Sequence, residues 1–132
     1  EITAAYGEAL MAVRFNEGLL PAAGHPSYSQ RVGISVRLKQ AGSDGLSQPS
    51  EEAALLDVEK RIVEKLCRDH LCLLGIVSTS EGIREFVLYT RNVRETQKAF
   101  KEVQGELGDY EMRIFVQADP HWGAYNQFKQ TS

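Results

Sequence analysis

Cysteine is scarce in this sequence, and so are the other features that define special classes of protein. The 132 residues include only two cysteines, Cys67 and Cys72. Two thiols are too few for the disulfide framework of a small secreted domain, so we expect a reducing compartment, with the cytoplasm as the default location. No apolar run approaches the roughly 20 residues that cross a bilayer, and the opening residues lack a signal-peptide pattern. A membrane is therefore not among the expected partners.

An excess of charge of one sign is also lacking. The net charge is -3, so no strong overall field attracts nucleic acid, although a local basic patch stays open as an alternative. Hydrophobic residues make up 42% and charged residues 25% of a chain of common domain length. The composition predicts a single globular domain over residues 1–132.

Hydrophobic periodicity indicates a mixture of strands and helices. The clearest strand covers residues 31–39, where Val32, Ile34 and Val36 alternate with polar residues. Further strands are expected at 9–16, 71–79, 83–90 and 110–118, with helices at 50–68, 92–107 and 119–129. The inner stripe of the first helix holds Leu55, Val58, Ile62 and Leu66, widened by Leu56, Val63 and Cys67.

The order of these elements predicts an α+β fold. Residues 30–118 read strand, helix, strand, strand, helix, strand, which is the split β-α-β unit of a ferredoxin-like core. We expect an antiparallel sheet whose two long helices cover one face. The additional N-terminal strand at 9–16 extends either edge of the sheet or pairs with a second copy of the chain, and the sequence leaves these alternatives open.

Residues that could perform chemistry are few. Cys67, His70 and Cys72 have donor atoms that suit zinc, but their spacing fits no standard site, and a core thiol with a helix-capping histidine explains them better. No phosphate-binding loop, nucleophile elbow or paired-histidine motif occurs. We therefore assign no catalytic residue, no cofactor and no metal.

The sheet face away from the two long helices is the candidate binding face. Basic and aromatic side chains are expected there, which are Arg31, Arg37, Lys39, Tyr89, Arg113 and Phe115. Such a combination can bind single-stranded RNA, and Phe86 to Tyr89 matches the end of an RNA-recognition signature. Glu85 departs from that signature. The alternative, that this face is solvated or covered by the last helix and a partner, is favoured.

The closing segment predicts a helix that docks on the sheet. Asp119, just before Pro120, is an expected N-cap. Trp122, Tyr125 and Phe128 are spaced three apart and so share one helix face. A cofactor or peptide site can use such a stripe, but docking of a terminal helix onto the sheet is favoured.

Several of these segments together resemble domain-of-unknown-function family 695. They are Asp44-Gly45-Leu46 with Glu51-Glu52, Gly82 to Thr90, Asp109-Tyr110, and Asp119-Pro-His-Trp122 with Tyr125. The resemblance spans about Arg31 to Phe128. It implies a bacterial, cytoplasmic α+β domain without assigned activity or catalytic residues. The family is also distantly similar to regulator of ribonuclease E activity B, which binds an enzyme and inhibits it.

The function expected from the sequence is a non-enzymatic, protein-binding or regulatory module. Its partner is expected to be another protein, with a homodimer as a further form of assembly. Single-stranded RNA binding through the open sheet face is the first alternative. A hydrolase or small-ligand binder with a pocket near the C-terminal helix is the second.

Overall fold

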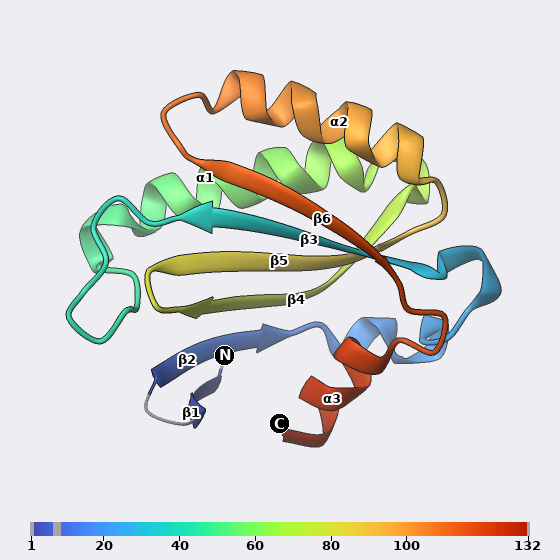
Figure 1. The fold of residues 1–132 in the computed structure, drawn as a ribbon, viewed down its shortest axis with the longest axis horizontal. Helices are drawn as coiled ribbons and strands as arrows, with labels where there is room; N and C mark the ends of the chain where they lie inside the picture. Colours follow the sequence, from blue (N-terminus) through green and yellow to red (C-terminus); the bar gives the residue numbers. More distant parts are fainter. Residues whose placement is uncertain (1, 7–8, 132) are drawn as a thin grey trace.

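A six-stranded antiparallel sheet forms the centre of the molecule. The computed structural model describes residues 2–6 and 9–131, and the side chains of residues 10–127. The strands lie in the order β1-β2-β4-β5-β3-β6 (Figure 1). They are β1 (Ile2–Tyr6), β2 (Ala9–Phe15), β3 (Gln30–Arg37), β4 (Cys72–Ser80), β5 (Ile83–Thr90) and β6 (Met112–Ala118). The predicted α+β class is confirmed.

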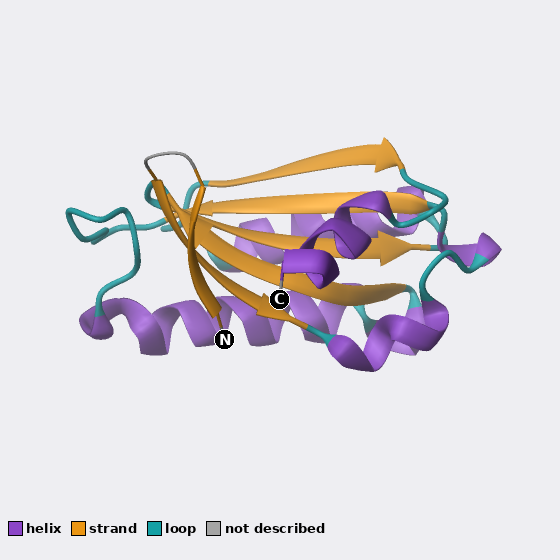
Figure 2. Cartoon of the chain, turned by 90° about the horizontal axis from the view of Figure 1, so that it is seen from below, coloured by secondary structure: helices purple, strands orange, loops and turns teal. Residues whose placement is uncertain are grey.

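Two long helices cover one face of this sheet. They are α1 (Pro49–Leu66), which runs along the length of the sheet (Figure 2), and α2 (Val93–Glu106). The main core lies between them and the strands, and its fully buried side chains include Val32, Ile34 and Val36 of β3. Because successive strand residues point to opposite faces, the alternation in β3 determines which face this core occupies.

The third helix, α3 (Gly123–Thr131), belongs to a second cluster on the opposite face. This cluster joins Trp122 and Tyr125 to Val13, Ile76, Val87 and Tyr89 of the strands. Short 3-10 helices at Glu17–Ala22, Pro26–Tyr28 and Arg68–His70 connect the elements. The sheet therefore has one face covered by α1 and α2 and one face covered in part by α3.

The strand order resolves the position of the N-terminal strand. β2 pairs with β4, and β1, which the sequence did not predict, pairs with β2 outside it. The four remaining strands lie in the order β4-β5-β3-β6, with β3 between β5 and β6. The ferredoxin-like prediction rests on the order of the elements along the chain, and that finer label stays a prediction.

Helix ends and faces agree with the sequence in part. The side chain of Asn92 accepts a hydrogen bond from the N–H of Glu95 at 3.0 Å, as its cap position predicts. Leu56 and Val63 do not widen the buried stripe of α1, because they are 49% and 38% exposed. Leu56 and Val63 instead line hollows between α1 and the strands β2 and β4. None of the described helices is long and apolar enough to cross a membrane.

Candidate functional site

The end of the chain is fixed to the sheet by aromatic stacking. The rings of Tyr89 and Trp122 stack with centroids 3.9 Å apart and planes 7° apart. Tyr125 stacks on Phe15 at 4.5 Å and donates a hydrogen bond to the carbonyl of Asn16 at 2.7 Å. The indole N–H of Trp122 donates to the carbonyl of Tyr28 at 2.8 Å. These contacts fill the space between α3 and the sheet, where the sequence allowed a ligand pocket.

Asp119 connects this helix to the strands. Its carboxylate accepts hydrogen bonds from the backbone N–H of Gly123 at 2.8 Å and from the hydroxyl of Tyr89 at 2.9 Å. Burial alone would raise the pKa of Asp119, but these hydrogen bonds and the guanidinium of Arg31 outweigh burial and lower it. Asp119 is therefore an ionised structural acceptor. The side chain of Phe128, the other residue expected in this docking, lies outside the described residues.

Two residues expected on the binding face take part instead in the contacts that hold α3 against the sheet. Tyr89 is fully buried beneath Trp122, so the prediction that it forms part of an open binding face is wrong. Arg31 is half-buried, with one guanidinium nitrogen 2.7 Å from the side-chain oxygen of Gln117 and another 3.4 Å from Asp119. α3 covers the end of the face where both residues lie.

Lys39 also lies away from the expected face. β3 ends at Arg37, and the next residues turn toward the start of α1. There the ammonium of Lys39 pairs with Asp109 and lies 4.3 Å from the centre of the Tyr110 ring. The odd-numbered alternation of β3 therefore stops before Lys39, and the prediction for this residue is wrong.

The other end of the same face remains uncovered. We call this surface the free patch; it consists of Arg37, Ile83, Glu85, Arg113 and Phe115. Phe115 is 59% exposed and Ile83 is 45% exposed, the values of residues without a layer above them. Ile83 lies directly opposite Arg37 in the sheet, and Ser35 lies between Glu85 and Arg113.

Open space lies beside Phe115 on this face. Gly33 of β3 lies opposite Phe115 on one side and Val87 on the other. A Cβ atom built on Gly33 would meet no atom within 4 Å. The Phe115 ring therefore stands beside open space, and an approaching group can contact both its edge and its face.

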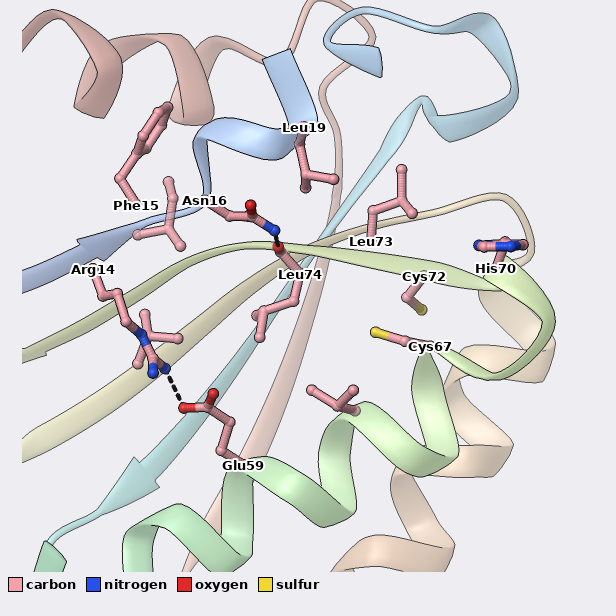
Figure 3. A pocket seen from close by; sticks show the side chains of 14 residues that line it. Arg14, Phe15, Asn16, Leu19, Glu59, Cys67, His70, Cys72, Leu73 and Leu74 are labelled. Carbon is pink, nitrogen blue, oxygen red and sulfur yellow. Dashed lines mark hydrogen bonds and ion pairs between the residues drawn. The ribbon is translucent and has the colours of Figure 1, made fainter. Parts of the chain in front are cut away.

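A separate cleft opens beside the first half of β4. β2 ends at Phe15, opposite Ile76, so no described strand pairs on that side with the residues of β4 before Ile76. Asn16 covers part of this edge, because its side-chain amide donates to the carbonyl of Leu74 at 2.9 Å (Figure 3). The cleft has a volume of about 530 Å³, and an ion pair between Arg14 and Glu59 crosses its rim.

The residues considered for zinc lie at the far end of this cleft. The sulfur atoms of Cys67 and Cys72 point toward each other there, while His70 is exposed (Figure 3). Burial, with a smaller contribution from Cys72, raises the pKa of Cys67 to about 12. Both thiols thus stay protonated near neutral pH, whereas metals and electrophiles react with thiolates. Within residues 10–127, no group of three His, Cys, Asp or Glu side chains is arranged to hold a metal ion.

The sequence identified part of the free patch and missed the rest. Arg37, Arg113 and Phe115 follow from strand alternation. Ile83 is not among the residues expected on this face. Glu85 was judged only by its misfit to an RNA signature, although it lies within the free patch.

These observations define an α+β domain with one covered sheet face and one face that a terminal helix covers in part. A family model, that of a family of unknown function (DUF695), matches residues 3–129. The chain therefore belongs to this family, as the sequence resemblance predicted. No curated protein matches the sequence. The distant similarity to regulator of ribonuclease E activity B stays a prediction.

Proposed function

We propose that this chain is a non-enzymatic, protein-binding module that contacts its partner through the free patch. The observation that carries the proposal is the exposure of Phe115, at 59%, on a sheet face whose other end is closed. Exposed aromatic and arginine side chains are the residue types enriched at the centres of protein interfaces. Arg113 and Arg37 lie on the same face as Phe115, so the patch joins an apolar contact with groups that can pair with carboxylates.

The composition of the patch favours a protein over RNA. An RNA surface needs several cations and stacking rings along one track. Arg31 and Tyr89 both contact the carboxylate of Asp119, beside α3. One cation and one aromatic ring are therefore not available to such a track. Glu85 lies in the same row of the sheet as Arg113, separated from it by Ser35, and its carboxylate would repel a phosphate backbone. A protein partner whose surface carries both positive and negative side chains would not be repelled by Glu85 in this way.

We also infer a regulatory role in a bacterial cytoplasm. This setting is supported by the resemblance to family 695 and by the scarcity of cysteine. The partner would then be an enzyme or another cytoplasmic protein whose activity the bound module changes. Subcellular fractionation of the source cells, followed by immunodetection, tests the location, and recovery in a secreted fraction would contradict it.

An affinity capture with matched variants tests the proposal. The tagged chain, an Arg113→Glu variant and a Phe115→Ser variant are each incubated with a lysate of the organism that encodes the protein. Lys98→Glu is the control, because it makes the same charge change on an exposed position of α2, away from the patch. Each capture is run with and without nuclease.

We expect a defined protein that the wild type and Lys98→Glu retain and both patch variants lose, whether or not nuclease is present. Loss of the captured material only after nuclease treatment would assign the patch to RNA. Equal capture by all variants would show that the free patch is not the binding surface.

A further inference from the structure

The edge strand β6 has backbone groups that point away from the sheet. Among the described strands, β6 ends the sheet and has only β3 as a neighbour. The side-chain amide of Gln104 in α2 donates a hydrogen bond to the carbonyl of Met112 at 3.1 Å, so this carbonyl points away from β3. Backbone direction alternates along an antiparallel strand, and the N–H and C=O groups of Ile114 and Val116 therefore also point outward.

The space beside this edge is open. A hollow of about 570 Å³ lies along it, lined by α2 and by β6 from Met112 to Phe115. α2 borders this hollow, and its Gln104 side chain contacts the edge at the carbonyl of Met112. Ile114 and Val116 direct their side chains into the core face, where they are partly buried, and Phe115 projects onto the opposite face. The edge carries neither a proline nor a bulge, two of the devices that prevent strand pairing.

We propose that a second copy of this chain pairs with β6 in antiparallel fashion, about a twofold axis at Phe115. In this register Ile114 of one copy exchanges backbone hydrogen bonds with Val116 of the other, and the reverse pair follows by symmetry. Phe115 lies directly opposite Phe115 of the other copy in a non-hydrogen-bonded pair, the closer of the two antiparallel spacings.

Two observations select this register. Phe115 is the most exposed of the large hydrophobic residues whose exposure is described, and the twofold axis places it against an identical ring. Arg113 then lies opposite Gln117 of the other copy, so no like charges meet on the patch side of the ladder. A register centred on Ile114 would instead oppose Phe115 to Arg113 and leave its ring without an apolar neighbour.

The dimer would also complete the binding surface. This inference rests on the proposed function, because the axis joins two free patches into one continuous face with the paired rings at its centre. The contact is a short ladder with one aromatic pair, well below the area of an obligate dimer. We therefore expect assembly that depends on concentration.

Mass measurement across a dilution series, with an edge variant, tests the pairing. We expect the wild type to approach twice its chain mass of 14.7 kDa at high concentration and to return to one chain mass on dilution. Val116→Pro removes an outward N–H that β3 does not use, and proline is tolerated at an edge strand. This variant should keep one chain mass at every concentration, while Val116→Ala, which keeps the N–H, should dimerise like the wild type.

Cysteine cross-linking tests the register without relying on Val116→Pro. Phe115→Cys should form an intermolecular disulfide under air oxidation with a copper catalyst, whereas Arg113→Cys should not. The wild type reports any contribution from Cys67 and Cys72. A single chain mass at every concentration would overturn the dimer. A dimer that persists in Val116→Pro without Phe115→Cys cross-linking would place the contact elsewhere, for example on β1. Either result leaves the affinity capture to decide the proposed function by itself.

Discussion

At the scale of single residues, two carboxylates are built into the interior as hydrogen-bond acceptors. Glu51 accepts from the backbone N–H groups of Lys39 and Gln40, each at 2.9 Å, and from the hydroxyl of Tyr110 at 2.7 Å. Asp119 holds α3 in the same manner. Among the described residues, no buried side-chain nitrogen or oxygen atom lacks a partner. These acids therefore stabilise loops and a helix end, and neither is free to transfer protons.

The first prediction concerns Glu51→Gln, which replaces one acceptor oxygen by an N–H donor. Each oxygen of Glu51 receives a backbone N–H, so the amide group of Gln would face a donor whichever way it is turned. We expect a loss of about 1–3 kcal/mol in the free energy of unfolding at pH 7. Urea denaturation measures the loss, and Glu52→Gln, which changes an exposed neighbour, is the control.

The same pair of proteins tests the pKa of Glu51. Burial would raise this pKa, but the hydrogen bonds from Lys39, Tyr110 and Gln40 outweigh burial and lower it below the usual 4.5. A lowered pKa in the folded state contributes stability above the unfolded pKa, and this contribution is lost as the pH falls through the folded value. The difference between wild type and Glu51→Gln should therefore narrow below about pH 4.5. A constant difference would contradict the assignment.

Only one of these two carboxylates could be predicted from the sequence. Asp119 stands just before Pro120, a pattern that predicts an N-cap with the helix starting there. α3 begins only at Gly123, but the Asp119 carboxylate still accepts hydrogen bonds from the N–H groups of Gly123 and Ala124. Glu51 also stands in the first turn of a helix, so the sequence suggests a contact with the helix dipole. Its partners come from the loop after β3 and from Tyr110. No local pattern in the sequence indicates contacts between residues that lie so far apart along the chain.

At the scale of elements, a loop glycine holds the β4–β5 hairpin. Gly45 has φ +82°, and its carbonyl accepts from the N–H of Gly82 at 2.9 Å. A Cβ atom at Gly45 would lie 2.8 Å from the backbone nitrogen of Glu81. Glu81 and Gly82 both have positive φ, as a tight hairpin turn requires. The loop and the turn therefore fit together only because residue 45 has no side chain.

The second prediction compares two glycine substitutions. Gly45→Ala should lower the free energy of unfolding by at least about 1–3 kcal/mol, because the side chain adds strain and meets the hairpin backbone. Gly105→Ala should raise it by about 0.5–1 kcal/mol, since position 105 lies in α2 with open space around it and alanine favours a helix. Thermal unfolding of both variants checks the opposite signs. Shifts in the same direction would contradict this account.

Removal of the Asp119 carboxylate is the third prediction, and it concerns α3. Asp119→Ala removes the cap of the helix and leaves the hydroxyl of Tyr89 without its acceptor. We expect the free energy of unfolding to fall by about 1–3 kcal/mol and amide hydrogen exchange to become faster in residues 123–127. Trp122 is the only tryptophan, so its fluorescence reports the same event as a shift to the red. Asp109→Ala, at an exposed carboxylate, should leave the amide exchange of residues 123–127 and the fluorescence of Trp122 unchanged.

The elements themselves were predictable where the periodicity is regular. The alternation in β3 and the inner stripe of α1 both indicate the faces that the structure buries. Periodicity shows which side of a helix is apolar, but it does not show how tightly the neighbouring strands pack against it. Leu56 and Val63 were placed in the core for that reason, although both are exposed. The pairing of β2 with β4 is likewise a long-range fact without a local signal.

At the scale of the whole molecule, the two sides of the sheet are unequal. The side under α1 and α2 holds a core that runs across β3, β4, β5 and β6. The other side holds a smaller cluster at one end, where α3 meets β2 and the first 3-10 helices. The free patch exists because this second layer stops short. The extent of α3 therefore sets the size of the surface that we assign to binding.

The last prediction is that the chain cannot fold stably without α3. Trp122 and Tyr125 are fully buried, and aromatic side chains of this kind each bury about 150–250 Å². At about 25 cal/mol per Å², the two contribute at most about 8–12 kcal/mol together, comparable to the roughly 5–15 kcal/mol that stabilise a whole domain.

A chain ending at Ala118 would also expose Tyr89. We expect it to lose cooperative urea unfolding and to bind an apolar dye. A chain ending at Gln127 keeps both aromatic residues and should unfold cooperatively. If the shorter chain instead unfolds at the urea midpoint of the full chain, the cluster around Trp122 and Tyr125 would not be needed for a stable fold. The unequal covering of the two sheet faces would then have no part in the stability of the protein.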